Sequence, residues 1–202
     1  MKLRITYIVL TALIAIGAKH VRLFDGRTLN GWEGDKSIFR IQDRAIVGGN
    51  LKEGIKQNEF LCTTNEYSDF ELRLKFKLIG EGGNAGVQVR SRRIPKNNEL
   101  IGYQADIGDG YWGSLYDESR RNKVLAKADE KLVAAVLKHD DWNEYRIRCE
   151  GRRIQLWLNG KQTVDYVETD ESIEQTGIIG LQIHGGKPSE AWYKDITLQV
   201  LP

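Results

Sequence analysis

Apolar and polar residues alternate strictly over ten positions from Asp69 to Leu78. Phenylalanine and leucine occupy every second position, and a charged residue stands at each position between them. Successive side chains of a β-strand point to opposite faces of its sheet. The spacing therefore predicts a strand with one buried face and one solvated face.

A second pattern runs from Arg153 to Tyr166, where apolar residues alternate on both sides of the pair Asn159-Gly160. A two-residue hairpin turn needs positive φ at both of its central residues, and Asn-Gly meets that need best. The segment is thus predicted to form a β-hairpin.

Shorter signals of the same kind, separated by turn residues, predict further strands, and one interruption has helical spacing. Leu132, Val133, Val136 and Leu137 predict a short helix over residues 129–138. Short strands without a βαβ alternation or an internal repeat favour an all-β fold, a two-sheet antiparallel β-sandwich of jelly-roll type. The further strands are predicted at residues 39–47, 59–63, 85–90, 102–107, 113–116, 143–150, 178–184 and 193–201.

The N-terminus differs from the rest of the chain. Lys2 and Arg4 precede an apolar run over residues 5–16, which is followed by small residues. This pattern predicts a signal peptide over residues 1–18, since the run is short for a membrane span. A retained anchor helix is the alternative. We expect one domain over residues 19–202, a periplasmic or secreted location, and no stable membrane span after cleavage.

Charge and cysteine content exclude several classes of protein. The chain has 30 basic and 28 acidic residues, and removal of residues 1–18 leaves 28 of each. Nucleic-acid binding needs a concentrated positive charge, so no nucleic-acid partner is expected. Cys62 and Cys149 are too few for a disulfide framework, and the sequence leaves open whether they pair. The sequence has no CxxC or HxxxH spacing, so a zinc site is not expected.

Three predicted strands carry two polar residues each at period two, opposite their apolar residues. Such residues are often only the solvated face of a strand. Amide, guanidinium, carboxylate and imidazole groups repeated on three strands nevertheless favour a ligand site. The polar pairs are Gln88 and Arg90, Gln104 and Asp106, and Gln182 and His184.

The chemistry of this site is narrowed by what the sequence lacks. It contains no Gly-x-Ser-x-Gly elbow, phosphate-binding loop or cluster of metal ligands. A carboxylate pair for ordinary glycoside hydrolysis would come from Asp106, Asp117 or Glu118, at a separation that the sequence does not give. Aromatic residues in or beside the same segments could stack on sugars or pack in the core. These are Tyr103, Tyr111, Trp112, Tyr116 and Trp192.

Several ordered motifs resemble the 3-keto-disaccharide hydrolase family, formerly a domain of unknown function numbered 1080. They include LFDGRTLNGW, GGNAGVQVR, GYQADIGDGYWGSLYDESRR and GIIGLQIHGG, and the likeness runs from about residue 21 to the C-terminus. The resemblance implies a concanavalin A-like jelly roll, exported by bacteria, that acts on small carbohydrates oxidised to a ketone at C3. A C3 ketone acidifies the C2 proton, so one base could start a β-elimination at C1, followed by hydration.

The resemblance also implies roles for residues. Arg90 would hold the ketone or enolate oxygen, and Asp106 and His184 would act as base or proton shuttle. Two departures from the family pattern are Ala85, where many members have serine, and the segment Trp-Tyr-Lys-Asp near the end, which puts the role of an arginine there in doubt. The expected substrate-binding residues are Asn84, Gln88, Tyr103, Gln104, Tyr116, Glu118 and Gln182.

No cofactor is required by this reading. Whether a divalent cation binds stays open, since Asp106, Asp109 and His184 could supply ligands. Asp109 also suits the turn in Gly-Asp-Gly, which is the alternative. A non-catalytic carbohydrate-binding module is the main alternative function, and an adhesion domain is a third, because sandwich folds serve all three roles. The oligomeric state stays open.

Overall fold

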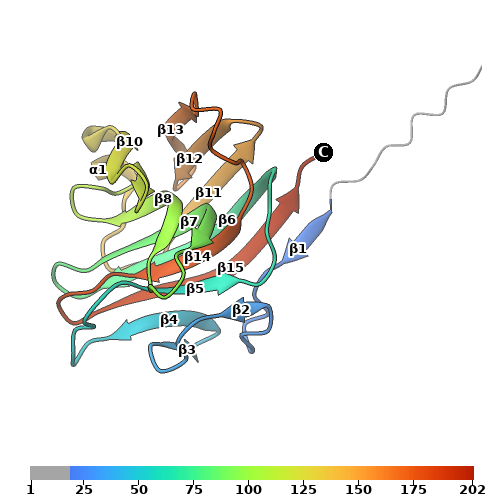
Figure 1. The fold of residues 1–202 in the computed structure, drawn as a ribbon. Helices are drawn as coiled ribbons and strands as arrows, with labels where there is room; N and C mark the ends of the chain where they lie inside the picture. The colour runs from blue at the N-terminus through green and yellow to red at the C-terminus, as the bar shows by residue number, and fades with distance from the viewer. Residues whose placement is uncertain (1–18) are drawn as a thin grey trace, which may run out of the picture.

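The structure is a computed structural model that describes residues 19–202 as two antiparallel β-sheets stacked in two layers (Figure 1). The signal-peptide prediction concerns residues 1–18 and lies outside the described residues. Over residues 19–202, no helix has the length and apolar character needed to cross a membrane.

The first sheet contains eight strands of the described chain. Seven follow one another across the sheet, and β1 (His20–Arg22) pairs with β15 beside them. Their order is β13 (Lys161–Val167), β12 (Arg153–Leu158), β11 (Asn143–Glu150), β6 (Phe70–Ile79), β15 (Ser189–Val200), β4 (Ala45–Asn50) and β3 (Phe39–Gln42).

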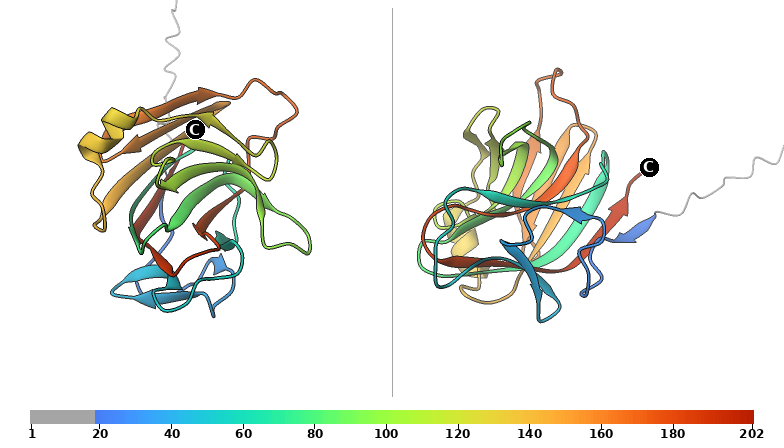
Figure 2. Two further views of the ribbon diagram at one scale, coloured as in Figure 1. Left: turned by 90° about the vertical axis from the view of Figure 1, so that its left-hand side faces the viewer. Right: turned by 60° about the horizontal axis from the view of Figure 1, so that its bottom comes forward.

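The second sheet contains seven strands of the described chain, and its outer face carries the candidate site. Helix α1 (Glu130–Val136) lies at the edge of the layers, against β13 (Figure 2). The strand order is β10 (Lys123–Ala126), β9 (Leu115–Glu118), β8 (Leu100–Gly108), β7 (Asn84–Arg93), β14 (Ile178–Ile183), β5 (Glu59–Thr63) and β2 (Trp32–Glu33).

The core lies between the sheets and follows the predicted alternation. In β6, Phe70, Leu72 and Leu74 are buried, whereas Arg73 is exposed. Asn159 and Gly160 adopt φ of 47° and 80° in the turn between β12 and β13, which confirms the predicted hairpin. The fold-class prediction, an antiparallel two-sheet sandwich with one short helix, is confirmed.

Several predicted elements need correction in their bounds: the strand predicted over residues 113–116 is β9 at Leu115–Glu118, and the one predicted over residues 193–201 is β15, which begins at Ser189. The single strand predicted over residues 39–47 is instead the hairpin of β3 and β4, because Asp43 and Arg44 turn the chain with φ of 49° and 60°. The helix is shorter than residues 129–138. Asp129 caps its start by accepting a hydrogen bond from Leu132 N, and Leu137 leaves the helical conformation.

The cysteines occupy different layers and do not pair. Cys149 lies in the main core between the sheets, whereas Cys62 packs with Phe60 and Leu100 in a separate small cluster. Both thiols are free and buried. This settles the alternative that the sequence left open.

Candidate active site

A pocket of about 190 Å³ lies on the outer face of the second sheet. The side chains around it come mainly from β7, β8 and β9 and from the end of β14. Six of the seven lining residues are among the predicted site residues, and Tyr111 is the addition. The lining residues are Asn84, Gln104, Asp106, Tyr111, Tyr116, Glu118 and His184.

Strand pairing explains why residues distant in sequence meet here. Val87 and Val89 are buried in the core, so Gln88 takes the opposite face of β7. In the ladder, Gln88 is paired with Gln104, and Gln104 with Tyr116. The alternation within each strand and the register between strands therefore align these polar side chains in one row across β7, β8 and β9.

Hydrogen bonds link the floor of this face into a chain that ends on Asp106. Ser91 Oγ donates to Gln88 Oε1 at 2.6 Å, and Gln88 Nε2 donates to Gln104 Oε1 at 3.0 Å. Gln104 Nε2 then donates to Asp106 Oδ1 at 2.8 Å. Each donor points toward the carboxylate, so the chain polarises in one direction and holds Asp106 in place.

Gly86 makes room for this chain. A Cβ atom at Gly86 would stand 2.4 Å from Cδ of Gln104, closer than nonbonded atoms approach. The amide of Gln104 therefore lies over the backbone of β7, a position that only glycine permits.

Asp106 has the properties of a base suited to neutral pH. Asp106 is 4% exposed, and this burial raises its pKa to about 7. The hydrogen bond from Gln104 lowers the pKa but does not cancel the effect of burial. The nearby charge of Glu118 raises the pKa further. Among the described residues no hydrogen bond reaches Oδ2, so that oxygen can accept a proton from a ligand.

Two neighbours keep their protons more readily than usual. Burial, and then the charge of Glu99, raises the pKa of Glu118, while His184 opposes the shift. Burial and the charges of Glu118 and Asp106 raise the pKa of Tyr116, so its hydroxyl stays a donor. The pocket thus pairs a base with a phenol that can donate to a developing negative charge.

His184 stands at the end of β14 and is exposed. Its Nδ1 lies 2.6 Å from the carbonyl oxygen of Gly185. A carbonyl only accepts, so Nδ1 carries a proton and Nε2 is the nitrogen free to exchange one. Its backbone N–H donates to Asn84 O at 3.0 Å, which ties it to β7.

Arg90 does not join the pocket, and the parity prediction for it is wrong. A bulge between Val89 and Arg92 changes the pairing with β8, and Arg90 has a φ of 49°. Its side chain is fully buried, with an ion pair to Asp69 at 2.8 Å and hydrogen bonds to Ser68 O, Gly151 O and Gln175. It therefore anchors loops at the end of the sandwich and is withdrawn as an oxyanion-binding group.

Tyr103 is also placed away from the pocket. It points into the core, where its hydroxyl donates to Glu168 at 2.8 Å. The family resemblance implied a substrate-binding role for Tyr103, but in β8 its side chain takes the face opposite to Gln104 and Asp106. Tyr111 lies in the loop after β8, where alternation gives no signal.

Gln88 and Gln182 lie on the expected face but beneath the surface. Both are 0% exposed. Gln88 belongs to the hydrogen-bonded chain that ends on Asp106, whereas both polar atoms of the Gln182 amide are buried without a partner among residues 19–202. Gln182 is paired with Gly86 across β14 and β7, next to the floor of the pocket.

The segment between β7 and β8 is tied to the chain around β5. Asn98 donates to Glu59 at 2.6 Å, and Asn58 donates to Glu99 at 3.0 Å. The hairpin tip is thereby fixed to the chain at the start of β5, although β7 and β5 are not neighbours in the sheet.

The suggested cation site does not assemble. Asp109 Oδ1 accepts a hydrogen bond from Trp112 Nε1 at 2.9 Å and does not line the pocket. Within residues 19–202 no group of three or more His, Cys, Asp or Glu side chains is close enough to hold a metal ion. The three ligands considered, Asp106, Asp109 and His184, are thus not brought together.

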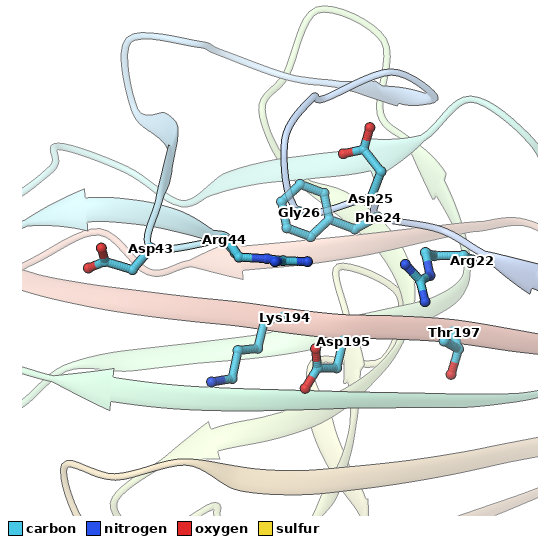
Figure 3. A pocket seen from close by; sticks show the side chains of 9 residues that line it. All are labelled: Arg22, Phe24, Asp25, Gly26, Asp43, Arg44, Lys194, Asp195 and Thr197. Carbon is cyan, nitrogen blue, oxygen red and sulfur yellow. The ribbon is translucent and has the colours of Figure 1, made fainter.

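A larger hollow of about 470 Å³ lies elsewhere, beside β1, β15 and the β3–β4 turn (Figure 3). Two of its three acidic groups are engaged locally: Asp195 pairs with Lys75 at 3.0 Å, and Asp25 accepts hydrogen bonds from Arg27 and Thr28. None of the predicted site residues lines it. The smaller pocket around Asp106 is therefore the candidate site.

Comparison with known proteins gives the family and the fold. The 3-keto-alpha-glucoside-1,2-lyase-like domain matches residues 19–199. A 3-keto-disaccharide hydrolase of Bacteroides thetaiotaomicron is 22% identical over 90% of this chain and 78% of its own.

Solved structures share the architecture. A Parabacteroides distasonis protein, provisionally assigned to the glycosyl hydrolases, has a TM-score of 0.71 at 20% identity, covering 91% of this chain and 94% of its own. The carbohydrate-binding module CBM66 of Bacillus subtilis has a TM-score of 0.60 at 16% identity, covering 84% and 95%. At such identities these likenesses show the fold alone, which serves both enzymes and binding modules.

Proposed function

The chain belongs to the 3-keto-alpha-glucoside-1,2-lyase-like family, and we propose that it cleaves glycosides whose sugar carries a ketone at C3, with Asp106 as the base. The observation that carries the proposal is Asp106 itself: a buried carboxyl with a pKa of about 7, fixed through Oδ1 and placed in a polar pocket. Family membership supports the class of substrate.

The first step removes the C2 proton, which the adjacent C3 ketone acidifies. The C2–H bond breaks, Asp106 Oδ2 takes the proton, and the electron pair forms an enolate on the C3 oxygen. Tyr116 and Asn84 line the pocket and can donate hydrogen bonds to that oxygen. They take the role that the family resemblance implied for Arg90.

The second step expels the leaving group. The C3 ketone re-forms, the electron pair of the former C2–C3 double bond makes a C1–C2 double bond, the C1–O bond breaks, and the departing oxygen keeps its electron pair. His184 Nε2, when protonated, donates the proton to that oxygen. Water then adds its oxygen to C1 and a proton to C2, so the net result is hydrolysis.

Release of the leaving group and exchange at C2 test this mechanism together. The purified protein is incubated with a 3-keto-glucoside in D₂O, and NMR follows both events. We expect Asp106→Asn to lower kcat/KM by about 10²–10⁴-fold and to abolish deuterium exchange at C2. The matched control is Asp165→Asn, an exposed carboxylate on β13 paired with Arg153, which should change neither.

Two outcomes would contradict the proposal in different ways. Turnover that survives Asp106→Asn would assign the base to another residue. Sugar binding without turnover of any 3-keto-glucoside would favour the second candidate function, a non-catalytic carbohydrate-binding module, which the fold shared with CBM66 supports.

We further propose export to the periplasm or medium, on the strength of the charged and apolar pattern of residues 1–18. Protein recovered from the periplasm or medium should begin near Lys19 by N-terminal sequencing. Retention of residues 1–18 in a membrane fraction would support the anchor helix instead.

A further inference from the structure

A second hollow of about 350 Å³ adjoins the candidate active site. It lies between the loop after β8 and helix α1, and its walls are aliphatic and aromatic, with charged groups around them. Trp112, Ala128, Val133, Ala134 and Leu137 form the apolar part, and Asp109, Lys127, Glu130 and His139 supply the charged or polar groups.

The walls of this groove are held firmly. The indole of Trp112 donates to Asp109 at 2.9 Å and stacks on Phe76, with ring centroids 6.3 Å apart. On the opposite side, Asn159 Nδ2 donates to Val136 O at 2.7 Å and fixes the end of α1. The groove is therefore formed before a ligand arrives.

Tyr111 joins the two hollows. Its side chain lines both the pocket and the groove, and at 44% it is among the few large apolar side chains of residues 19–202 that are exposed. The loop that carries it starts and ends beside the base: Asp106 N donates to Ser114 O at 3.0 Å, and Gly113 N donates to Asp106 O at 3.2 Å. A ligand that reacts at Asp106 and extends past Tyr111 reaches the groove.

The two hollows differ in chemistry. Amide, carboxyl, imidazole and phenol groups line the pocket, which suits the hydroxyls and carbonyl of a sugar. Aliphatic side chains and an indole line much of the groove. Of its polar groups, Asp109 is hydrogen-bonded to Trp112 and Lys127 is paired with Glu130, so they are already engaged. The groove therefore fits a ring with an apolar face better than a second hydrated sugar.

We propose that the groove is the leaving-group subsite and that it receives aglycones with an apolar face, aromatic rings in particular. The inference rests on the proposed function, because elimination at C1 requires the leaving group to project from the sugar pocket. Tyr111 contacts the ring at the junction, and Trp112 and α1 enclose it. The groove thus selects among glycosides after the pocket has selected the 3-keto sugar.

Two substrates that differ only in the leaving group separate these roles. Methyl 3-keto-glucoside fills the pocket alone, and phenyl 3-keto-glucoside adds a ring for the groove. The test variant is Ala134→Trp, which fills the groove from α1. Ala135→Trp is the matched control, because Ala135 is the next residue of the helix, is exposed and does not line the groove.

We expect Ala134→Trp to lower kcat/KM for the phenyl substrate by about tenfold, through loss of apolar contact, and to leave the methyl substrate within about twofold. Ala134→Glu, which places a charge in the apolar wall, should act in the same direction. Ala135→Trp should change neither substrate.

Equal effects of Ala134→Trp on both substrates, or no effect on the phenyl substrate, would overturn the subsite while leaving the proposed function intact. Failure of the unaltered protein to turn over methyl 3-keto-glucoside would instead contradict the proposed function, and the leaving-group role of the groove with it.

Discussion

The charged form of Asp106, which the proposed reaction needs as a base, destabilises the folded protein. A buried carboxylate loses hydration, and one hydrogen bond from Gln104 offsets only part of that loss, so its pKa rises to about 7. In the unfolded chain the same carboxyl has its ordinary pKa of 3.8. The native state therefore binds the proton more tightly than the unfolded state does.

Linkage gives the sign of the resulting pH dependence. Below about pH 4 both states are protonated and Asp106 costs nothing, whereas between pH 4 and 7 native stability falls as the pH rises. We expect Asp106→Asn to raise Tm clearly at pH 8 and little at pH 4, as measured by thermal unfolding. An equal change in Tm at both pH values would contradict the raised pKa.

Gln104 tunes the same carboxyl in the opposite direction. Replacing it by leucine removes the hydrogen bond that lowers the Asp106 pKa, so the pKa should rise. A hydrogen bond to a charged group is worth about 1.5–3 kcal/mol, so the rising limb of the kcat/KM profile should move up by about 1–2 pH units.

Activity profiles of Gln104→Leu and of a control, Gln162→Leu on the exposed surface of β13, would check this effect. A merely structural role for Gln104 would lower activity at every pH without moving the limb. Gln88→Leu should shift the limb in the same direction by less, because Gln88 acts only through Gln104.

At the scale of elements, strand β9 is held in place by ion pairs on the face opposite to the pocket. Its period of two turns Tyr116 and Glu118 to the pocket and Asp117 inward, where Arg120 and Arg121 bind the buried carboxylate. Arg121 also pairs with Glu168 at 2.6 Å, and Tyr103 donates to the same carboxylate. These charges fix the strand that presents two pocket residues.

Glu168 should make this anchor sensitive to acid. Burial would raise its pKa, but Arg121 and its other hydrogen bonds hold the pKa at about 2. Because this value is below the unfolded one, the stability it contributes is present above about pH 4.5 and is lost as the pH falls through about 2.

Glu168→Gln should therefore flatten acid unfolding and cost about 3 kcal/mol at pH 7, the lower end for a broken buried pair because Arg121 is partly exposed. Urea unfolding at several pH values measures both effects. Glu174→Gln, at an exposed pair with Arg92, should cost little. An unchanged acid limb in Glu168→Gln would contradict the assignment.

Arg90 shows that alternation along a strand fails to predict the face of a side chain where a β-bulge interrupts the strand. Alternation places Gln88 and Gln104 correctly because each lies in an unbroken stretch of ladder. The bulge after Val89 depends on how β7 meets β8, and residues on either side of it carry no distinct sequence signal. The same applies to the β3–β4 turn, where Asp43 and Arg44 take positive φ without a glycine.

At the scale of the whole molecule, the two layers keep the cysteines apart. Cys149 is enclosed between the sheets and Cys62 lies on the outer face under Leu100, and burial raises the pKa of both thiols to about 12. We expect no reaction with a thiol reagent in the native protein and two thiols after unfolding. A Tm that changes on addition of reductant would contradict this arrangement.

Period two and the Asn-Gly turn were enough to determine strands, their buried faces and the sandwich class, because these are local properties of the chain. The ordered motifs were enough to identify the family. Only the tertiary structure decided which polar residues meet. Strand register joined Asp106, Tyr116 and His184, a bulge removed Arg90, and Gln182 became fully buried. Those outcomes depend on contacts between distant segments, which spacing along one strand does not encode.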